Sequence, residues 1–346
     1  MIDEQTNIAH EVLDFLPERD YFYSLRATNC AETIWLTPST SFRTFSPLQE
    51  WAYRMKVTFC GYTRPELLSN FPALVVLNNS LSGFGYDQFA SPAGDDLIFM
   101  NSNQTVRLNH EIEQWDTNGS AYVWVQVPEL DNNNVPIYAY WGNRQIAEPP
   151  VYSTNGAVWD ADFEAVYHFD GSADDATANR VHETPVNIEP GDWIPSQAGR
   201  GLNLDAVDEY VDTLTPASGL DIDGSKPKTV SGWVFIRDFN FAGLYQSGNL
   251  FNPGQDFSLK AQGFNLWRVQ LWGTPDFDFN YPSLNRWVHI TVVHDGTEGR
   301  AYADGQLVGS EASVLDTRDN ITFRIGRWRD FYLDGIVDEM RITSGA

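Results

Sequence analysis

Short runs of alternating apolar and polar residues, separated by clusters of turn-forming residues, constrain this fold more than any other feature. Residues 53–59 and 121–127 alternate, and residues 73–77 form a continuous apolar run. Turn-forming clusters, Asn-Asn-Ser at 78–80 and Thr-Asn-Gly at 117–119, lie between them. Alternation with a period of two indicates a strand that is buried on one face. Because helical patterns are rare after residue 50, the sequence predicts an all-β fold of antiparallel sandwiches.

The length of the chain points to more than one such sandwich. A chain of 346 residues exceeds the size at which a single hydrophobic core usually stops growing, about 250–300 residues. Pro149, Pro150 and the pair Asn155-Gly156 interrupt the strand pattern as a linker would. Residues 8–16 carry apolar residues at helical spacing before Pro17, which predicts one short helix. We therefore predict a partly helical extension and connector (1–47), a first sandwich (48–150), a linker (151–162) and a second sandwich (163–346).

The charge balance excludes some partners. The sequence has 47 Asp and Glu residues against 22 Lys and Arg, a net charge of −25. Such a surface repels nucleic acid and anionic membranes, so we expect neither as a partner. The excess of carboxylates suits calcium, which prefers oxygen ligands, although solubility alone would also explain it.

The ends of the sequence and its cysteines leave the cellular context open. Residues 1–5 lack the basic and apolar regions of a signal peptide, and no apolar stretch approaches the ~18 residues of a membrane helix. The chain is then expected to be either part of a secreted or cell-surface protein or a protein displayed in another way, as virion proteins are. The two cysteines, Cys30 and Cys60, either form one disulfide or remain as two thiols.

The second half of the chain resembles the LamG-like jelly roll, a concanavalin A-type lectin/glucanase fold. No single motif is specific, but many occur in the order of the family. They are the stretches 165–171 (AVYHFDG), 199–205 (GRGLNLD), 230–234 (VSGWV), 286–296, 300–305, 324–327 and 333–342. The Asp-Gly pairs at 295–296 and 304–305 have the turn residues that hairpins need. The resemblance implies that the second sandwich is a concanavalin A-like jelly roll.

Residues 48–160 resemble a bacterial domain of unknown function that often directly precedes such jelly rolls. The matching stretches are 51–54, 95–99, 111–115, 123–128 and 138–143. This resemblance adds a domain and an extracellular context, but no mechanism. Residues 1–47 fall outside both resemblances.

Catalysis is poorly supported by the pattern of acidic residues. Glycoside hydrolysis needs two carboxylates that face one another across the scissile bond. Glu111 and Glu113 have the spacing of residues on one strand face, but they lie outside the jelly roll. Asp338 and Glu339, adjacent on a predicted strand, are expected on opposite faces. The histidines on or beside strands, such as His168, are expected to be structural, and no Gly-x-Ser-x-Gly elbow occurs.

Two kinds of binding site are predicted in the jelly roll. The family resemblance implies a calcium site, for which Asp170 and Asp338 match by position, with Asp174 in a nearby loop. For glycans, aromatic rings beside hydrogen-bonding groups suit sugar binding, and the Arg-Trp-Arg triplet also suits acidic sugars. Trp328 is expected to be an exposed ring and Trp233 to belong to the core. The predicted ligand-binding residues are Trp328, Arg327, Arg329, Trp272, Trp267 and Tyr245.

These inferences converge on a non-catalytic carbohydrate-binding or adhesion protein whose partner is a glycan or glycoprotein. Two alternatives stay open. One is a structural component of a virion or surface filament, with residues 1–47 as a protein contact. The other is a glycoside hydrolase.

Overall fold

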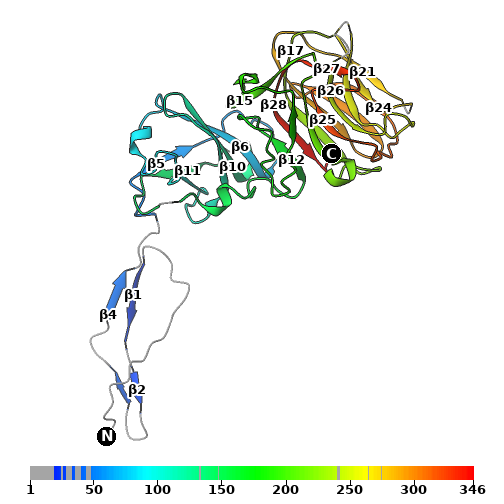
Figure 1. Ribbon diagram of the computed structural model, residues 1–346. Coiled ribbons are helices and arrows are strands. Elements are labelled where there is room, and N and C mark those ends of the chain that lie inside the picture. The colour runs from blue at the N-terminus through cyan, green and yellow to red at the C-terminus, as the bar shows by residue number, and fades with distance from the viewer. Residues whose placement is uncertain are drawn as a thin grey trace.

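Two β-sandwiches lie side by side, and a narrow pair of strands projects from the first one (Figure 1). The structure is a computed structural model. It describes residues 19–24, 26–28, 33–35, 40–43, 48–131, 134–146, 148–239, 242–263, 265–273 and 275–346. Within these ranges the regular structure is almost entirely β, with short 3-10 turns, which confirms the predicted fold class. No helix in them is long and apolar enough to cross a membrane. The predicted helix at 8–16 and Cys30 lie outside the described residues, and Cys60 is an exposed free thiol.

The projecting part consists of short antiparallel pairs. Strand β1 (Asp20–Tyr23) pairs with β4 (Thr40–Arg43), and β2 (Arg26–Thr28) pairs with β3 (Thr33–Trp35). Phe22 and Trp35 are 73% and 55% exposed, so this ladder carries large aromatic side chains in contact with solvent.

The first sandwich packs a three-stranded sheet, β6-β10-β9, against a four-stranded sheet, β5-β11-β7-β8. Val123 and Val125 of β10 alternate into its core beside Trp141, as the sequence period predicts. Trp124 lies between them and therefore points to the opposite face, toward the jelly roll. The strands are β5 (Tyr53–Val57), β6 (Leu68–Asn78), β7 (Ile98–Met100), β8 (Arg107–Leu108), β9 (His110–Trp115), β10 (Ser120–Leu130) and β11 (Ile137–Trp141).

The second sandwich is a jelly roll of an eight-stranded and a seven-stranded sheet. The larger sheet has the order β14-β15-β28-β17-β22-β23-β24, with β12 paired to β28, and the smaller has the order β13-β16-β25-β18-β19-β20-β21. The bounds of the larger sheet are β12 (Phe163–Tyr167), β14 (Trp193–Pro195), β15 (Arg200–Asp205), β17 (Lys228–Ile236), β22 (Trp287–His294), β23 (Glu298–Ala303), β24 (Gln306–Ala312) and β28 (Asp334–Thr343). Those of the smaller sheet are β13 (Thr184–Val186), β16 (Tyr210–Pro216), β18 (Gly243–Gly248), β19 (Ser258–Gly263), β20 (Leu266–Gln270), β21 (Phe277–Asn280) and β25 (Ile321–Ile325).

The turns of the jelly roll follow from its glycines. Gly296 and Gly305 end the Asp-Gly pairs that connect β22 to β23 and β23 to β24. Their φ angles are +99° and +74°, a region that glycine enters without steric cost. The predicted hairpin turns are therefore confirmed.

The segment between the two sandwiches is packed between them. Val158 and Trp159 are 0% and 5% exposed and form one apolar cluster with Trp124 of β10 and Val166 of β12. Residues 151–162, predicted as a linker, thus join the two sandwiches through buried side chains. We call this contact region between the sandwiches the junction, and the candidate site lies there.

Candidate functional site at the module junction

The outer face of the larger jelly-roll sheet carries aromatic pairs. Val230, Val234 and Ile236 of β17 fill the core, so Trp233 and Phe235 point outward. Trp233 packs edge-on against His289 of β22 with ring centroids 5.2 Å apart. The expectation that Trp233 belongs to the core is wrong, because it is half-buried on the opposite face of its strand.

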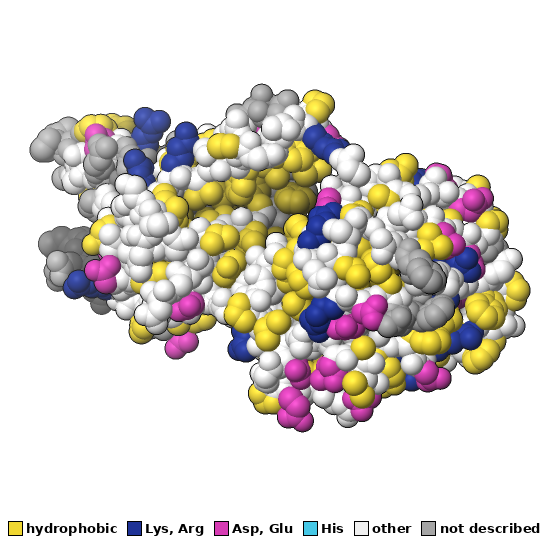
Figure 2. All heavy atoms as spheres, turned by 90° about the horizontal axis from the view of Figure 1, so that it is seen from above, with side chains coloured by type: hydrophobic (Ala, Val, Ile, Leu, Met, Phe, Trp, Pro, Cys, Tyr) yellow, Lys and Arg dark blue, Asp and Glu magenta, His cyan; other side chains and the backbone are white. Residues whose placement is uncertain are grey.

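A groove runs between this face and the first sandwich. It appears as the apolar hollow between the modules in Figure 2 and has a volume of about 480 Å³. Trp233 and His289 line it from the jelly roll, and Glu339 and Arg341 of β28 supply its charged groups. The rings from the first sandwich are Phe59, Tyr62, Phe71 and Trp124.

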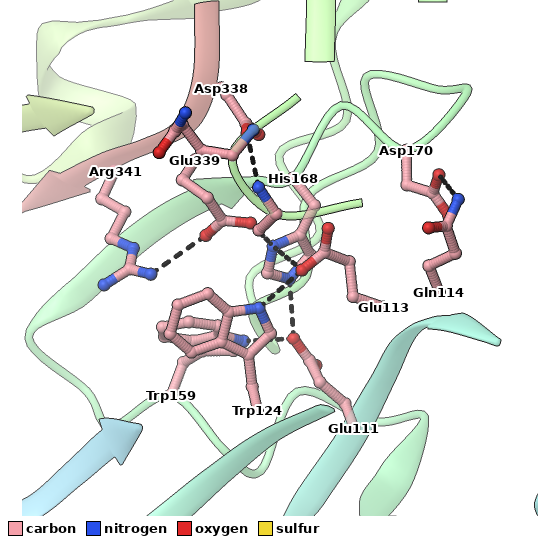
Figure 3. A network of polar contacts seen from close by, with 12 residues as sticks. Glu111, Glu113, Gln114, Trp124, Trp159, His168, Asp170, Asp338, Glu339 and Arg341 are labelled. Carbon is pink, nitrogen blue, oxygen red and sulfur yellow. Dashed lines mark hydrogen bonds and ion pairs between the residues drawn. The ribbon is translucent and has the colours of Figure 1, made fainter. Parts of the chain in front are cut away.

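A buried cluster of acidic residues lies beside the groove, with His168 at its centre (Figure 3). The Nε2 atom of His168 is 2.8 Å from Glu111 Oε1, and its Nδ1 atom is 2.6 Å from Glu339 Oε1 and 3.8 Å from Glu113 Oε2. Both ring nitrogens are therefore satisfied. Glu111 and Glu113 of β9 both reach His168, as expected for two residues on one strand face.

Aromatic and basic groups enclose this cluster. The Trp124 indole N–H donates to Glu113 Oε2 at 2.8 Å, and the Trp159 indole N–H donates to Glu111 Oε1 at 3.0 Å. Arg341 donates to Glu339 Oε2 at 3.0 Å, and its guanidinium lies 4.5 Å from the centre of the Trp124 ring. Residues of the first sandwich, the connecting segment and the jelly roll thus share one polar network.

Burial separates the pKa values of the carboxyl groups. Desolvation raises the pKa of Glu113 to about 9. Desolvation, together with the charge of Glu339, raises the pKa of Asp338 to about 8. At Glu339 burial acts in the same upward direction, but contacts with His168 and Arg341 outweigh it and lower the pKa. The pKa of His168 is raised well above its ordinary value because its carboxylate neighbours outweigh desolvation.

The prediction that Asp338 and Glu339 face opposite sides is wrong. Glu339 has φ +53°, and the pairing of β28 with β17 shifts register at this point, so a β-bulge interrupts the alternation. Val337 and Met340 fill the jelly-roll core on either side of the bulge. Both carboxylates consequently lie on the side of the first sandwich.

The residues predicted to bind a glycan are mostly interior. Tyr245 and Trp267 are fully buried, and Trp328 is 5% exposed, so the expectation of an exposed Trp328 ring is wrong. Strand β26 (Arg327–Trp328) pairs with β27 (Phe331–Tyr332) in a hairpin that lies against β18 and buries this ring.

Part of the predicted set does come together. The Arg329 guanidinium lies 4.7 Å from the ring centres of both Trp272 and Trp328, and Lys260 Nζ lies 4.0 Å from that of Trp328. Arg327 instead stacks on Tyr210 at 4.7 Å. These basic side chains and aromatic rings therefore mainly contact one another in cation–π pairs.

The carboxylates predicted to bind calcium have separate partners. Asp338 Oδ2 accepts the backbone N–H groups of Gln197 and Ala198, and Asp170 accepts from the side chain of Gln114 at 3.3 Å. Asp174 pairs with His182 at 3.3 Å. Within the described part of the chain, the one group of acidic and histidine ligands close enough to share an ion is Glu113, His168 and Glu339. The sequence did not reveal this group, because its members come from three distant stretches of the chain.

Comparisons with known proteins agree with the family resemblance of each module. Residues 205–346 match the family model of the concanavalin A-like lectin/glucanases superfamily. Residues 93–190 match a domain of unknown function, DUF2341. The matches confirm that a jelly roll of this superfamily follows the uncharacterised domain. No curated protein matches the chain.

Several solved structures are similar to parts of the chain. Domain 4 of AbnA, an extracellular arabinanase of Geobacillus stearothermophilus in complex with arabinotriose, is 22% identical, with a TM-score of 0.44 over 54% of this chain and 95% of that one. The binding domain of botulinum neurotoxin serotype D/C is 12% identical, with a TM-score of 0.42 over 53% and 49%. The Trypanosoma rangeli sialidase is 16% identical, with a TM-score of 0.43 over 69% and 40%. Similarity at this level assigns no role to individual residues of this chain. Their roles are therefore argued from the geometry of the junction.

Proposed function

We propose that this chain is a non-catalytic glycan-binding protein of a secreted or cell-surface assembly, and that the junction groove holds the sugar. The observation that carries this proposal is the arrangement of aromatic rings on both walls of the groove beside charged groups. Sugars present apolar C–H faces that pack on rings such as Trp233 and Phe71, while the Arg341 guanidinium can hydrogen-bond to hydroxyl groups. The match to a superfamily of lectins and glucanases supports a carbohydrate ligand.

The burial of the acidic cluster favours binding over hydrolysis. A retaining glycosidase places two carboxyl groups about 5–5.5 Å apart, both reaching the same glycosidic bond. Glu339 lines the groove, whereas Glu113 lines a different cleft of about 240 Å³. The side chain of Glu113 is 0% exposed and that of Glu339 is 4% exposed. A sugar in the groove therefore meets one of the two acids, and both oxygens of that acid already have partners.

A glycan array on the full chain, followed by titration of the best glycan, tests the proposal. Trp233→Ala removes a ring that lines the groove and should weaken binding roughly 10- to 100-fold, the range typical of a buried aromatic contact. Trp287→Ala is the matched control, because Trp287 lies on the same outer face, packed against Phe235, but does not line the groove. A blank array, or equal losses in the two variants, would refute a glycan site in this groove.

A structural role in an assembly is the second candidate, and the projecting ladder is the observation that favours it. Strands β1 and β4 stand apart from the two sandwiches, and Phe22 and Tyr23 are 73% and 49% exposed (Figure 1). Light scattering on the full chain and on a Phe22→Ser, Tyr23→Ser variant tests this role. Oligomers that the double substitution dissociates would favour assembly, whereas two monomeric proteins would argue against it.

A further inference from the structure

We propose that Glu113, His168 and Glu339 form a binding site for a zinc-like divalent transition metal ion that clamps the two modules together. Their ligating atoms all lie within 4.8 Å of one another. One imidazole nitrogen and two carboxylates suit zinc, whereas calcium takes six to eight oxygen ligands and disfavours imidazole. The site is separate from the glycan proposal, since two of its three ligands do not line the groove.

Each proposed ligand is held in place by a neighbour, and His168 and Glu339 are held through the atom that the ion does not need. His168 Nε2 is held by Glu111 at 2.8 Å, which leaves Nδ1 for the ion. Glu339 Oε2 is held by Arg341 at 3.0 Å, and Glu113 Oε2 is held by the Trp124 indole at 2.8 Å. A carboxylate that fixes the far nitrogen of a histidine ligand is the usual outer shell of a protein metal site.

The remaining oxygen of Glu113 is a second, independent indication. Glu113 Oε1 is buried without a hydrogen-bond partner among the described residues, and its side chain is 0% exposed. Buried carboxylate oxygens are seldom left unpartnered, because the loss of hydration is then uncompensated. A coordinated cation would compensate it.

Charge balance is consistent with an ion at this position. His168 Nδ1 and Glu339 Oε1 lie 2.6 Å apart, within hydrogen-bonding distance. A divalent ion would displace the proton between them and the proton of the Glu113 carboxyl group, leave the imidazole neutral, and offset the charges of Glu113 and Glu339. Both protons leave to solvent, so no other reactant is required.

The ion has a route to the site, and its ligands come from both modules. Glu113 and His168 line the cleft of about 240 Å³, together with Asp170, Asp174 and Asp175, whose carboxylates attract cations. Glu113 belongs to β9 of the first sandwich, whereas His168 and Glu339 belong to the jelly roll. Binding would therefore restrain the relative position of the sandwiches.

Calorimetric titration of the chelator-treated full chain with Zn²⁺ and, separately, with Ca²⁺ tests the site. The proposal expects one equivalent of Zn²⁺ to bind with a micromolar or lower Kd and to raise the Tm. It expects millimolar Ca²⁺ to leave the Tm unchanged. A wild-type chain that binds no Zn²⁺, or that prefers Ca²⁺, overturns the proposal whatever the variants do.

Glu113→Gln should weaken Zn²⁺ binding at least 100-fold, because the amide keeps an acceptor for Trp124 but loses the charged ligand. Asp170→Asn, a change in the same cleft that removes no ligand, should alter the Kd less than about threefold. Equal Zn²⁺ affinity in wild type and Glu113→Gln would mean that the ion binds elsewhere, and would overturn the assignment.

Discussion

His110 in the first sandwich makes stability depend on pH in a way that one substitution can isolate. Its side chain is buried between the rings of Phe99 and Tyr152, with both centroids 5.3 Å away. Its Nδ1 atom has no partner among the described residues. Burial lowers the pKa of His110 to about 4, from an ordinary value of 6.5.

The size of the effect follows from these two pKa values. Between pH 4 and 6.5 the unfolded chain holds a proton on His110 that the folded chain does not, so the free energy of unfolding falls as the pH falls. The difference at pH 4.5 is about 2.5 kcal/mol relative to pH 7.5, where the contribution is negligible. Phenylalanine has a similar ring and does not titrate, so His110→Phe removes this loss while keeping the edge-to-face contacts.

Urea unfolding of wild type and His110→Phe at pH 7.5 and pH 4.5, followed by tryptophan fluorescence, measures the difference. Other groups titrate equally in both proteins and cancel. We expect the variant to gain about 2.5 kcal/mol over wild type on going from pH 7.5 to 4.5. A gain below about 0.5 kcal/mol would refute the assignment of a neutral, desolvated histidine.

Two further substitutions test the packing. A Cβ atom on Gly243 would overlap the backbone nitrogen of Trp328, so Gly243→Ala should cost several kcal/mol of folding stability or prevent folding. The control, Gly61→Ala, has open space around it and should leave the Tm within about 2 °C of wild type. Equal Tm values in the two variants would contradict the close approach of Gly243 to the backbone of Trp328. Trp124→Phe removes the N–H that bonds to the buried carboxylate of Glu113 and should cost about 1–3 kcal/mol in urea unfolding; an unchanged unfolding midpoint would show that this bond does not hold the junction.

The strand pattern made most of the jelly roll predictable, because backbone geometry repeats locally. Val230, Val234 and Ile236 share one face of β17 as the two-residue period requires. The Asp-Gly turns also follow from local conformational preference. Such features need no knowledge of distant contacts.

The candidate site was less predictable, because distant contacts decide it. Both faces of β17 carry large apolar residues, so alternation alone does not reveal whether Trp233 or Val234 points to the core. Trp328 lies between two arginines, a pattern typical of a surface loop, yet Gly243 provides the space that lets its hairpin lie close to β18. The bulge at Glu339 reverses the expected face of one acid, and no local sequence signal marks it.

The site of glycan contact is the most direct test of the account. The chain is labelled with 5-fluorotryptophan, its ¹⁹F resonances are assigned by single substitutions, and the best glycan from the array is added. The account predicts that the resonances of Trp233 and Trp124 shift with the ligand, because both rings line the groove, while those of Trp272 and Trp328 stay in place. Shifts confined to Trp272 and Trp328 would contradict it and would locate the ligand on the opposite sheet of the jelly roll.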